Sequence, residues 1–140
     1  MIILDTNVIS EVLSRHRNQN VIDWLNGQEM AALFLSTNVF AELYFGAYLI
    51  QDALRRDGLL QSISRIRGEF SGRTLVFGDM AAEQYGRITA ARRLAGIPVE
   101  TKDAMIAAIC LAHGATLATR NVRDFDGLDL KLINPFEAKA

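Results

Sequence analysis

The sequence predicts an α/β fold in which helices cover both faces of a small parallel sheet. Short apolar segments of strand length alternate with longer segments that repeat hydrophobic residues at helical spacing. The chain has 140 residues, of which 50% are hydrophobic and only 2 are proline. This length and composition suit one hydrophobic core without a linker, so we expect a single domain over residues 1–140.

Apolar runs bounded by polar or turn-forming residues predict the strands. Residues 2–4 form the first run, which ends at the polar turn Asp5-Thr6-Asn7. The further expected strands are 33–35, 74–77, 115–118 and 131–133. Short apolar runs that alternate with helices are typical of parallel strands buried on both faces.

The first half of the chain predicts four helices. Residues 8–14 and 21–27 are short helical segments, and the second ends at Gly27. A longer helix follows the cap residues 36–38, and its apolar face repeats at steps of three and four through Phe40, Leu43, Ala47, Ile50 and Leu54. Another helix is expected over 59–70.

The second half predicts two helices with clear ends. The first covers 79–94 and stops at Gly96, and Pro98 prevents its continuation. Thr101 is expected to cap the next helix, which runs through His113 and ends at Gly114.

Charge and cysteine content narrow the class of protein. The formal net charge is -1, which argues against a large phosphate-binding surface but allows a small basic rim. The single cysteine, Cys110, excludes an internal disulfide, and its apolar neighbours predict a buried side chain. Neither a secretion signal nor an apolar run of membrane-spanning length is visible, so we expect a cytoplasmic protein without membrane contact.

Acidic residues follow several of the predicted strands. Asp5 comes directly after the first strand, and Glu42 lies in the first turns of the helix after the second. Asp103 opens the helix before strand 115–118, and Asn121 and Asp124 follow that strand. Since ligands of parallel sheets bind at the carboxyl ends of strands, we expect these residues to meet at one edge.

Clustered carboxylates repel one another unless protons or cations neutralise them. Hard divalent ions prefer oxygen ligands, and magnesium often takes one or two carboxylates together with water and substrate phosphate. Such an ion orients and deprotonates water for attack on phosphorus. His16 and His113 are the only histidines, so no zinc cluster is indicated.

Each acid also has a purely structural alternative. Asp103 lies in the first turn of a helix, where acids are favoured by the helix dipole. Asp124 follows Asn121 at the spacing of a loose capping box, and Asp5 is placed to cap the helix that follows it. Glu42 would then be an ordinary solvated helix residue. Spacing alone leaves both interpretations open.

Several segments closely resemble the PIN-domain toxins of the VapC and FitB kind. The opening run 1–11, with Asp5-Thr6-Asn7 inside it, resembles the start of these proteins. The segments that also match, in the same order along the chain, are 36–47, 103–108, 117–125 and 132–136. The resemblance therefore covers nearly the whole chain.

The resemblance implies a three-layer α/β/α sandwich with a small central parallel sheet. It also implies an endoribonuclease that uses Mg²⁺, with Mn²⁺ as an alternative, and that forms a homodimer. A cognate antitoxin, encoded alongside, would inhibit the toxin and could join it in a larger assembly.

The resemblance also implies roles for individual residues. Asp5 and Asp103 would ligate the metal directly, and Glu42 would complete the acid cluster or hold a water on the ion. Relatives differ in the fourth acidic place, which is either at Asn121 or three residues later. We expect Asp124 to supply that acid and Asn121 to contribute a neutral oxygen.

Neighbouring polar and basic residues complete the expected site. The residues expected to hydrogen-bond with the acids are Thr6, Asn7, Ser36 and Thr119. The residues expected to form a basic rim for the RNA backbone are Lys102, Arg120 and Arg123, with Arg92 and Arg93 as further candidates. Each of these arginines could instead be an ordinary solvated charge. Lys102 departs from the family pattern, which more often has an apolar or small residue there, and it could point to solvent or pair with a phosphate.

Two other classes of protein remain as alternatives at this point. A phosphatase of the haloacid-dehalogenase type also has an aspartate after its first strand, but it needs a second acid where Asn7 stands. A non-enzymatic acidic module would bind a partner without cleaving anything.

Three aromatic residues, Tyr44, Phe45 and Tyr48, flank the apolar face of their helix. They either fill the core or meet a dimer or antitoxin surface.

Overall fold

A computed structural model describes residues 1–138, and its centre is a parallel sheet of five strands. The strand order across the sheet is β3-β2-β1-β4-β5, and every neighbouring pair is parallel. The strands are β1 (Ile2–Leu4), β2 (Leu33–Ser36), β3 (Thr74–Leu75), β4 (Thr116–Ala118) and β5 (Leu132–Ile133). The first strand is thus central, and the chain adds strands on one side of it before crossing to the other.

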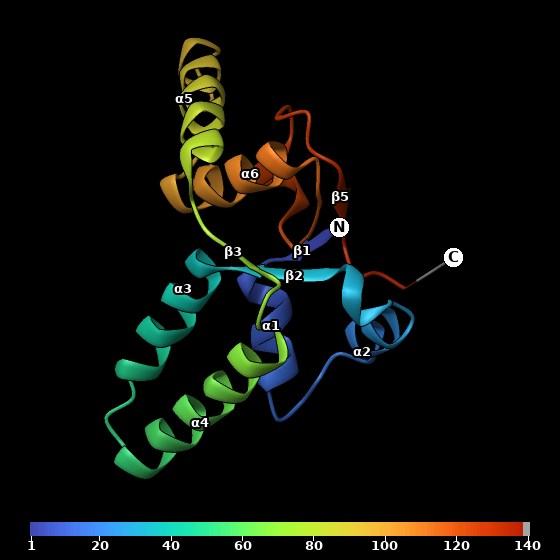
Figure 1. The fold of residues 1–140 in the computed structure, drawn as a ribbon, viewed down its shortest axis with the longest axis vertical. Coiled ribbons are helices and arrows are strands. Elements are labelled where there is room, and N and C mark those ends of the chain that lie inside the picture. The colour runs from blue at the N-terminus through green and yellow to red at the C-terminus, as the bar shows by residue number, and fades with distance from the viewer. Residues whose placement is uncertain (139–140) are drawn as a thin grey trace.

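Helices form a layer on each face of the sheet, as Figure 1 shows. One layer consists of α1 (Thr6–Leu13), α2 (Gln19–Asn26), α3 (Thr37–Tyr48) and α4 (Ala53–Glu69). The opposite layer consists of α5 (Asp79–Leu94) and α6 (Thr101–His113). Two 3₁₀ turns, Met30–Ala32 and Val122–Phe125, complete the elements. The predicted α/β/α sandwich is therefore confirmed.

The sheet is buried because helices cover both of its faces. Ile3, Leu4, Leu35 and Leu117 have no more than 1% of their surface exposed. Cys110 is fully buried in the facing helix α6, as expected, and desolvation raises the pKa of its thiol. Within residues 1–138, no helix is both long and apolar enough to cross a membrane.

The predicted long helix after β2 is wrong in its second half. The helix ends at Tyr48, and Leu54 belongs to α4, where 86% of its surface is exposed. The carboxylate of Asp52 accepts a hydrogen bond from the backbone N–H of Arg55 at 3.1 Å, so a new helix begins there. This cap also places the start of α4 six residues before the predicted position 59. The apolar repeat from Phe40 to Leu54 therefore includes residues of two helices, and the cap at Asp52 marks the start of the second one.

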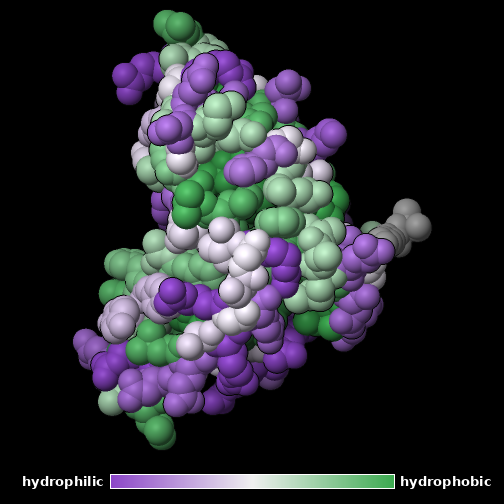
Figure 2. Space-filling model, viewed as in Figure 1, coloured by the Kyte–Doolittle hydropathy of each residue, from purple (hydrophilic) through white to green (hydrophobic). Residues whose placement is uncertain are grey.

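The exposed side of α3 carries large hydrophobic residues. Phe45 and Tyr48 each have 68% of their surface exposed, and Leu49, just beyond the helix, has 64%. Tyr44 is half-buried, and its hydroxyl accepts a hydrogen bond from Arg67 at 3.0 Å. Hydrophobic surface over α3 is visible in Figure 2. Phe45 and Tyr48 thus belong to the surface and not to the core.

The ends of α5 and α6 agree with the sequence, apart from one cap. Glu100 occupies the N-cap position of α6 without a side-chain cap bond, and Thr101 is the first helical residue instead of the cap. Gly114 ends α6 in the left-handed conformation with φ 61°, which leads the chain directly into β4.

Replacing glycine by alanine should have opposite effects at two positions. Gly114→Ala should lower the free energy of unfolding by about 1 kcal/mol, because a Cβ is disfavoured at positive φ. Gly58→Ala, inside α4 with open space around its Cα, should raise it by about 1 kcal/mol. Urea unfolding monitored by circular dichroism measures both. A stable Gly114→Ala protein would show that this helix end tolerates another conformation.

Candidate active site

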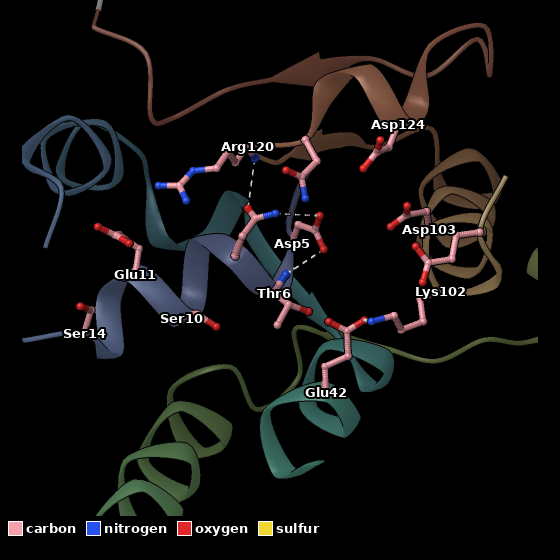
Figure 3. Close-up of a pocket in the computed structure, with 13 residues that line it drawn as sticks. Asp5, Thr6, Ser10, Glu11, Ser14, Glu42, Lys102, Asp103, Arg120 and Asp124 are labelled. Atoms are coloured by element: carbon pink, nitrogen blue, oxygen red, sulfur yellow. Dashed lines mark hydrogen bonds and ion pairs between the residues drawn. The ribbon is translucent and has the colours of Figure 1, made fainter. Parts of the chain in front are cut away.

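A polar hollow of about 560 Å³ lies at the carboxyl edge of the sheet, where β1 and β4 are neighbours. This is the place where the chain switches sides, and ligands of parallel sheets bind at such points. All four predicted acids line the hollow, each from a different segment: Asp5 after β1, Glu42 on α3, Asp103 on α6 and Asp124 on the second 3₁₀ turn. Figure 3 shows their carboxylates directed toward the same space.

Asp5 is the most firmly held of these acids. Its backbone N–H donates to the carbonyl of Ala118 at 2.9 Å, which ties it to the neighbouring strand. Its side chain caps α1 by accepting from the backbone N–H of Thr6 at 2.8 Å. The predicted capping role and the predicted site role of Asp5 are therefore compatible.

A buried hydroxyl group supports the second carboxylate oxygen of Asp5. Thr119 is fully buried, and its Oγ1 donates to Asp5 Oδ2 at 2.8 Å. Asn7 Nδ2 lies 3.3 Å from the same oxygen and 3.2 Å from Thr119 Oγ1. Burial raises the pKa of Asp5, while the Thr119 bond is the strongest influence that lowers it. Thr119 thus supports the Asp5 carboxylate through a hydrogen bond but does not itself line the hollow.

Asp103 is the acid that its surroundings perturb most clearly. Burial, and then the negative charges of Asp5, Asp124, Glu100 and Glu42, raise its pKa to about 6. Asp124 lines the same hollow as Asp103, while its assignment as the fourth acid stays a prediction. Asn121 also lines the hollow, but its side chain does not form the predicted cap for the turn 122–125.

Lys102 provides a positive charge beside the acids. Its Nζ lies 4.0 Å from Glu42 Oε1, and both side chains are partly exposed. At this distance and exposure the pair contributes little to stability. Lys102 therefore points toward the site, not simply into solvent.

The donor set fits a hard divalent ion with several water ligands. Within residues 1–138, no three His, Cys, Asp or Glu side chains converge closely enough to bind one ion together. Magnesium, however, needs only one or two carboxylates and keeps water in its other positions. Thr6 Oγ1 is buried next to Asp5, and within residues 1–138 it has no hydrogen-bond partner, so it could contact such a water.

The predicted basic rim is only partly assembled around the hollow. Arg120 lines it, and its guanidinium stacks 3.9 Å from the ring centroid of Phe136. Arg123 is exposed on the turn 122–125 and does not line the hollow. Arg92 is turned away, because its guanidinium donates to the carbonyl oxygens of Ile97 and Asp126.

The structure also shows site residues that the sequence reasoning missed. They are Ser10, Glu11, Ser14 and Glu100. The first three lie three, four and seven residues after Asn7, so helical spacing from Asn7 could have found them. Ser36, by contrast, is fully buried outside the hollow, where its hydroxyl caps α3 by accepting from Val39 N–H at 3.2 Å.

Comparisons with known proteins agree with this geometry. The PIN domain family model matches residues 2–130. The plasmid stability protein StbB of Pseudomonas syringae is 43% identical over 99% of this chain and 100% of its own length. The VapC ribonuclease Y4jK of Sinorhizobium fredii is 36% identical over 98% and 99%, and the toxin FitB of Neisseria gonorrhoeae is 34% identical over 97% and 99%. A chain in the crystal structure of FitAcB from Neisseria gonorrhoeae superposes with a TM-score of 0.92 at 34% identity, covering 97% of this chain and 99% of that one.

Removing the Thr119 hydroxyl should destabilise the protein. Thr119→Val leaves Asp5 Oδ2 and the backbone N–H of Asn121 without their buried partner, so the free energy of unfolding should fall by about 1–3 kcal/mol. Thr119→Ser keeps the hydroxyl and should recover most of that loss. Chemical unfolding at pH 7.5 compares the two variants, and equal stability of Val and Ser would contradict the role given to the hydroxyl.

The raised pKa of Asp103 predicts a variant that is more stable than the parent. An acid whose folded pKa lies above its unfolded value makes folding less favourable as pH rises from 3.8 to about 6. Asp103→Asn should therefore raise the unfolding free energy by about 1 kcal/mol at pH 8, after allowance for solvent screening. The difference should vanish near pH 4. Thermal unfolding in EDTA at both pH values tests this, and a less stable variant at pH 8 would refute it.

Proposed function

The chain belongs to the PIN-domain family, and from this premise we propose that it is the ribonuclease toxin of a toxin–antitoxin pair. The observation that carries the proposal is the meeting of four carboxylates from four segments at one edge of the sheet. The names of relatives that match nearly the whole chain, a VapC ribonuclease and the toxin FitB, support it. Because the chain matches the PIN-domain family, nothing supports the alternative of a haloacid-dehalogenase-type phosphatase.

The acids divide into two roles in this proposal. Asp5 and Asp103 hold a divalent ion, Mg²⁺ or Mn²⁺, and Glu42 and Asp124 orient water and accept its proton. When bound, the ion lowers the pKa of water and shields negative charge on the phosphate. The hydrogen bonds from Thr119, Thr6 and Asn7 to Asp5 keep its carboxylate oriented before substrate arrives.

The substrate is RNA that is unpaired at the cleavage point. Lys102 and Arg120 border the acids and supply cations for the backbone on either side, with Arg123 as a more distant contact. Hydrolysis in this manner leaves a 5′-phosphate and a 3′-hydroxyl. The net charge of -1 is compatible with a small basic rim of this kind.

The partners follow from the same premise. A cognate antitoxin inhibits the enzyme in the cytoplasm, and an arginine placed among the acids would neutralise them. The exposed Tyr48 and Leu49 at the C-terminal end of α3 are available for a homodimer or for the antitoxin, and the two together would give a larger assembly.

Asp5→Asn should abolish RNA cleavage. Changing a residue that only orients a metal ligand typically lowers metal affinity or activity 10- to 100-fold. Loss of a direct ligand should therefore lower kcat/KM by at least about a hundredfold. Asp79→Asn, an exposed acid in the first turn of α5, is the matched control and should cut as fast as the parent.

The assay uses the chain purified free of antitoxin, unpaired RNA and added Mn²⁺. Calorimetric titration with Mn²⁺ provides a second measurement, and Asp5→Asn should lose the binding that Asp79→Asn keeps. Unchanged cleavage by Asp5→Asn would reject the metal assignment. A parent that leaves RNA intact and binds no Mn²⁺ in the millimolar range would reject the nuclease and favour a non-enzymatic binding module.

A further inference from the structure

A second, more apolar hollow of about 310 Å³ lies directly beside the acid site. Its lining residues are Asn38, Ala41, Glu42, Phe45 and Lys102. Glu42 and Lys102 also line the acid hollow, so these two side chains form the wall between the two spaces. Figure 3 shows Glu42 and Lys102 lying together at the edge of the acid site.

Phe45 gives this hollow an exposed aromatic face. It follows Glu42 by three residues on α3, so both side chains lie on the same side of the helix. With 68% of its surface exposed, its ring is available to stack against a planar ligand. Tyr48 is equally exposed on the same helix but does not line this hollow, so exposure alone does not define the hollow.

Polar groups also line this hollow. Lys102 carries three N–H donors, and its distance of 4.0 Å from Glu42 leaves it free to reach an anion. Asn38 donates from Nδ2 to the sulfur of Met105 at 3.5 Å, which orients its amide. Within residues 1–138 its Oδ1 accepts no hydrogen bond, so that oxygen is available to the hollow.

We propose that this second hollow is a nucleoside subsite, in which one unpaired base next to the scissile phosphate stacks on Phe45. The inference rests on the proposed ribonuclease function. A phosphate among the acids is joined covalently to its neighbouring nucleosides, and the second hollow, across the wall of Glu42 and Lys102, is close enough to receive one of them.

The chemistry of the hollow suits RNA better than a protein partner. From the acid hollow into the second hollow, the acids are followed first by Lys102 and then by the ring of Phe45. This matches the order of scissile phosphate, adjacent backbone and base in a single strand. Stacking on an aromatic ring accepts any base, while the free Oδ1 of Asn38 favours a base that offers an N–H at its edge.

The subsite can be tested by fluorescence with the full chain in EDTA, where cleavage cannot occur. The probes are hexauridylates that carry one 2-aminopurine at each position in turn, because stacking quenches this base. At one position, the parent and Phe45→Tyr should quench it strongly. Phe45→Ala should lose that quenching and bind about five- to a hundredfold more weakly. Leu54→Ala, which removes an exposed hydrophobic side chain of α4 outside this hollow, is the control and should behave as the parent.

Several outcomes would overturn the subsite. The subsite is wrong if Phe45→Ala quenches the base and binds RNA like the parent, or if Leu54→Ala loses as much quenching as Phe45→Ala does. If sedimentation shows that Phe45→Ala dissociates a dimer and loses binding only for that reason, the face belongs to a second copy. If the variant binds RNA normally but fails to bind its antitoxin, the occupant is a protein segment.

A parallel cleavage assay with Mn²⁺ separates this inference from the proposed function. A parent that cuts RNA without any Phe45-dependent quenching refutes the subsite alone. A parent that neither binds nor cuts RNA refutes the ribonuclease proposal and the subsite with it.

Discussion

Mutual repulsion among carboxylates at the edge of the sheet is the constraint that organises this molecule. Asp5, Glu42, Asp103 and Asp124 line one hollow there, and Lys102 lies 4.0 Å from Glu42. Burial and neighbouring charges keep the pKa of Asp5 and Asp103 above the ordinary value. The fold tolerates these raised pKa values because other contacts hold the two acids in place. Asp5 is held by a hydrogen bond to the neighbouring strand, by its capping of α1 and by the Thr119 hydroxyl, and Asp103 lies on a helix that packs on the sheet.

Parallel strands make such convergence possible. Each strand ends at the same edge, and the next residue in sequence is delivered there by backbone geometry alone, as Asp5 after Leu4 and Thr119 after Ala118 show. Helix caps then fix the directions of the side chains. The site therefore needs few dedicated contacts, because the elements that build the core also position the acids.

Much of this arrangement could be predicted from the sequence, and the failures have physical causes. Asp79–Leu94 and Thr101–His113 end as expected because glycines and a proline mark their boundaries. The break after Tyr48 was missed because Leu54 continues an apolar repeat by chance, while the cap at Asp52 that starts the next helix lies between them. Ser10, Glu11 and Ser14 line the hollow from the face of α1 that begins at Asn7, and no strand end or motif in the sequence marks that face as part of a site. The contacts of Lys102 with Glu42, and of Arg120 with Phe136, depend on tertiary packing that no spacing reveals.

The central position of β1 has a consequence for how the protein is made. Asp5 directly follows β1, yet the partner strand β4 and the Thr119 hydroxyl lie more than a hundred residues later in the chain and so are synthesised after it. A nascent chain thus holds an unpaired strand edge and an unsupported aspartate through most of translation. The acid site can therefore be completed only after β4 has been made and has paired with β1.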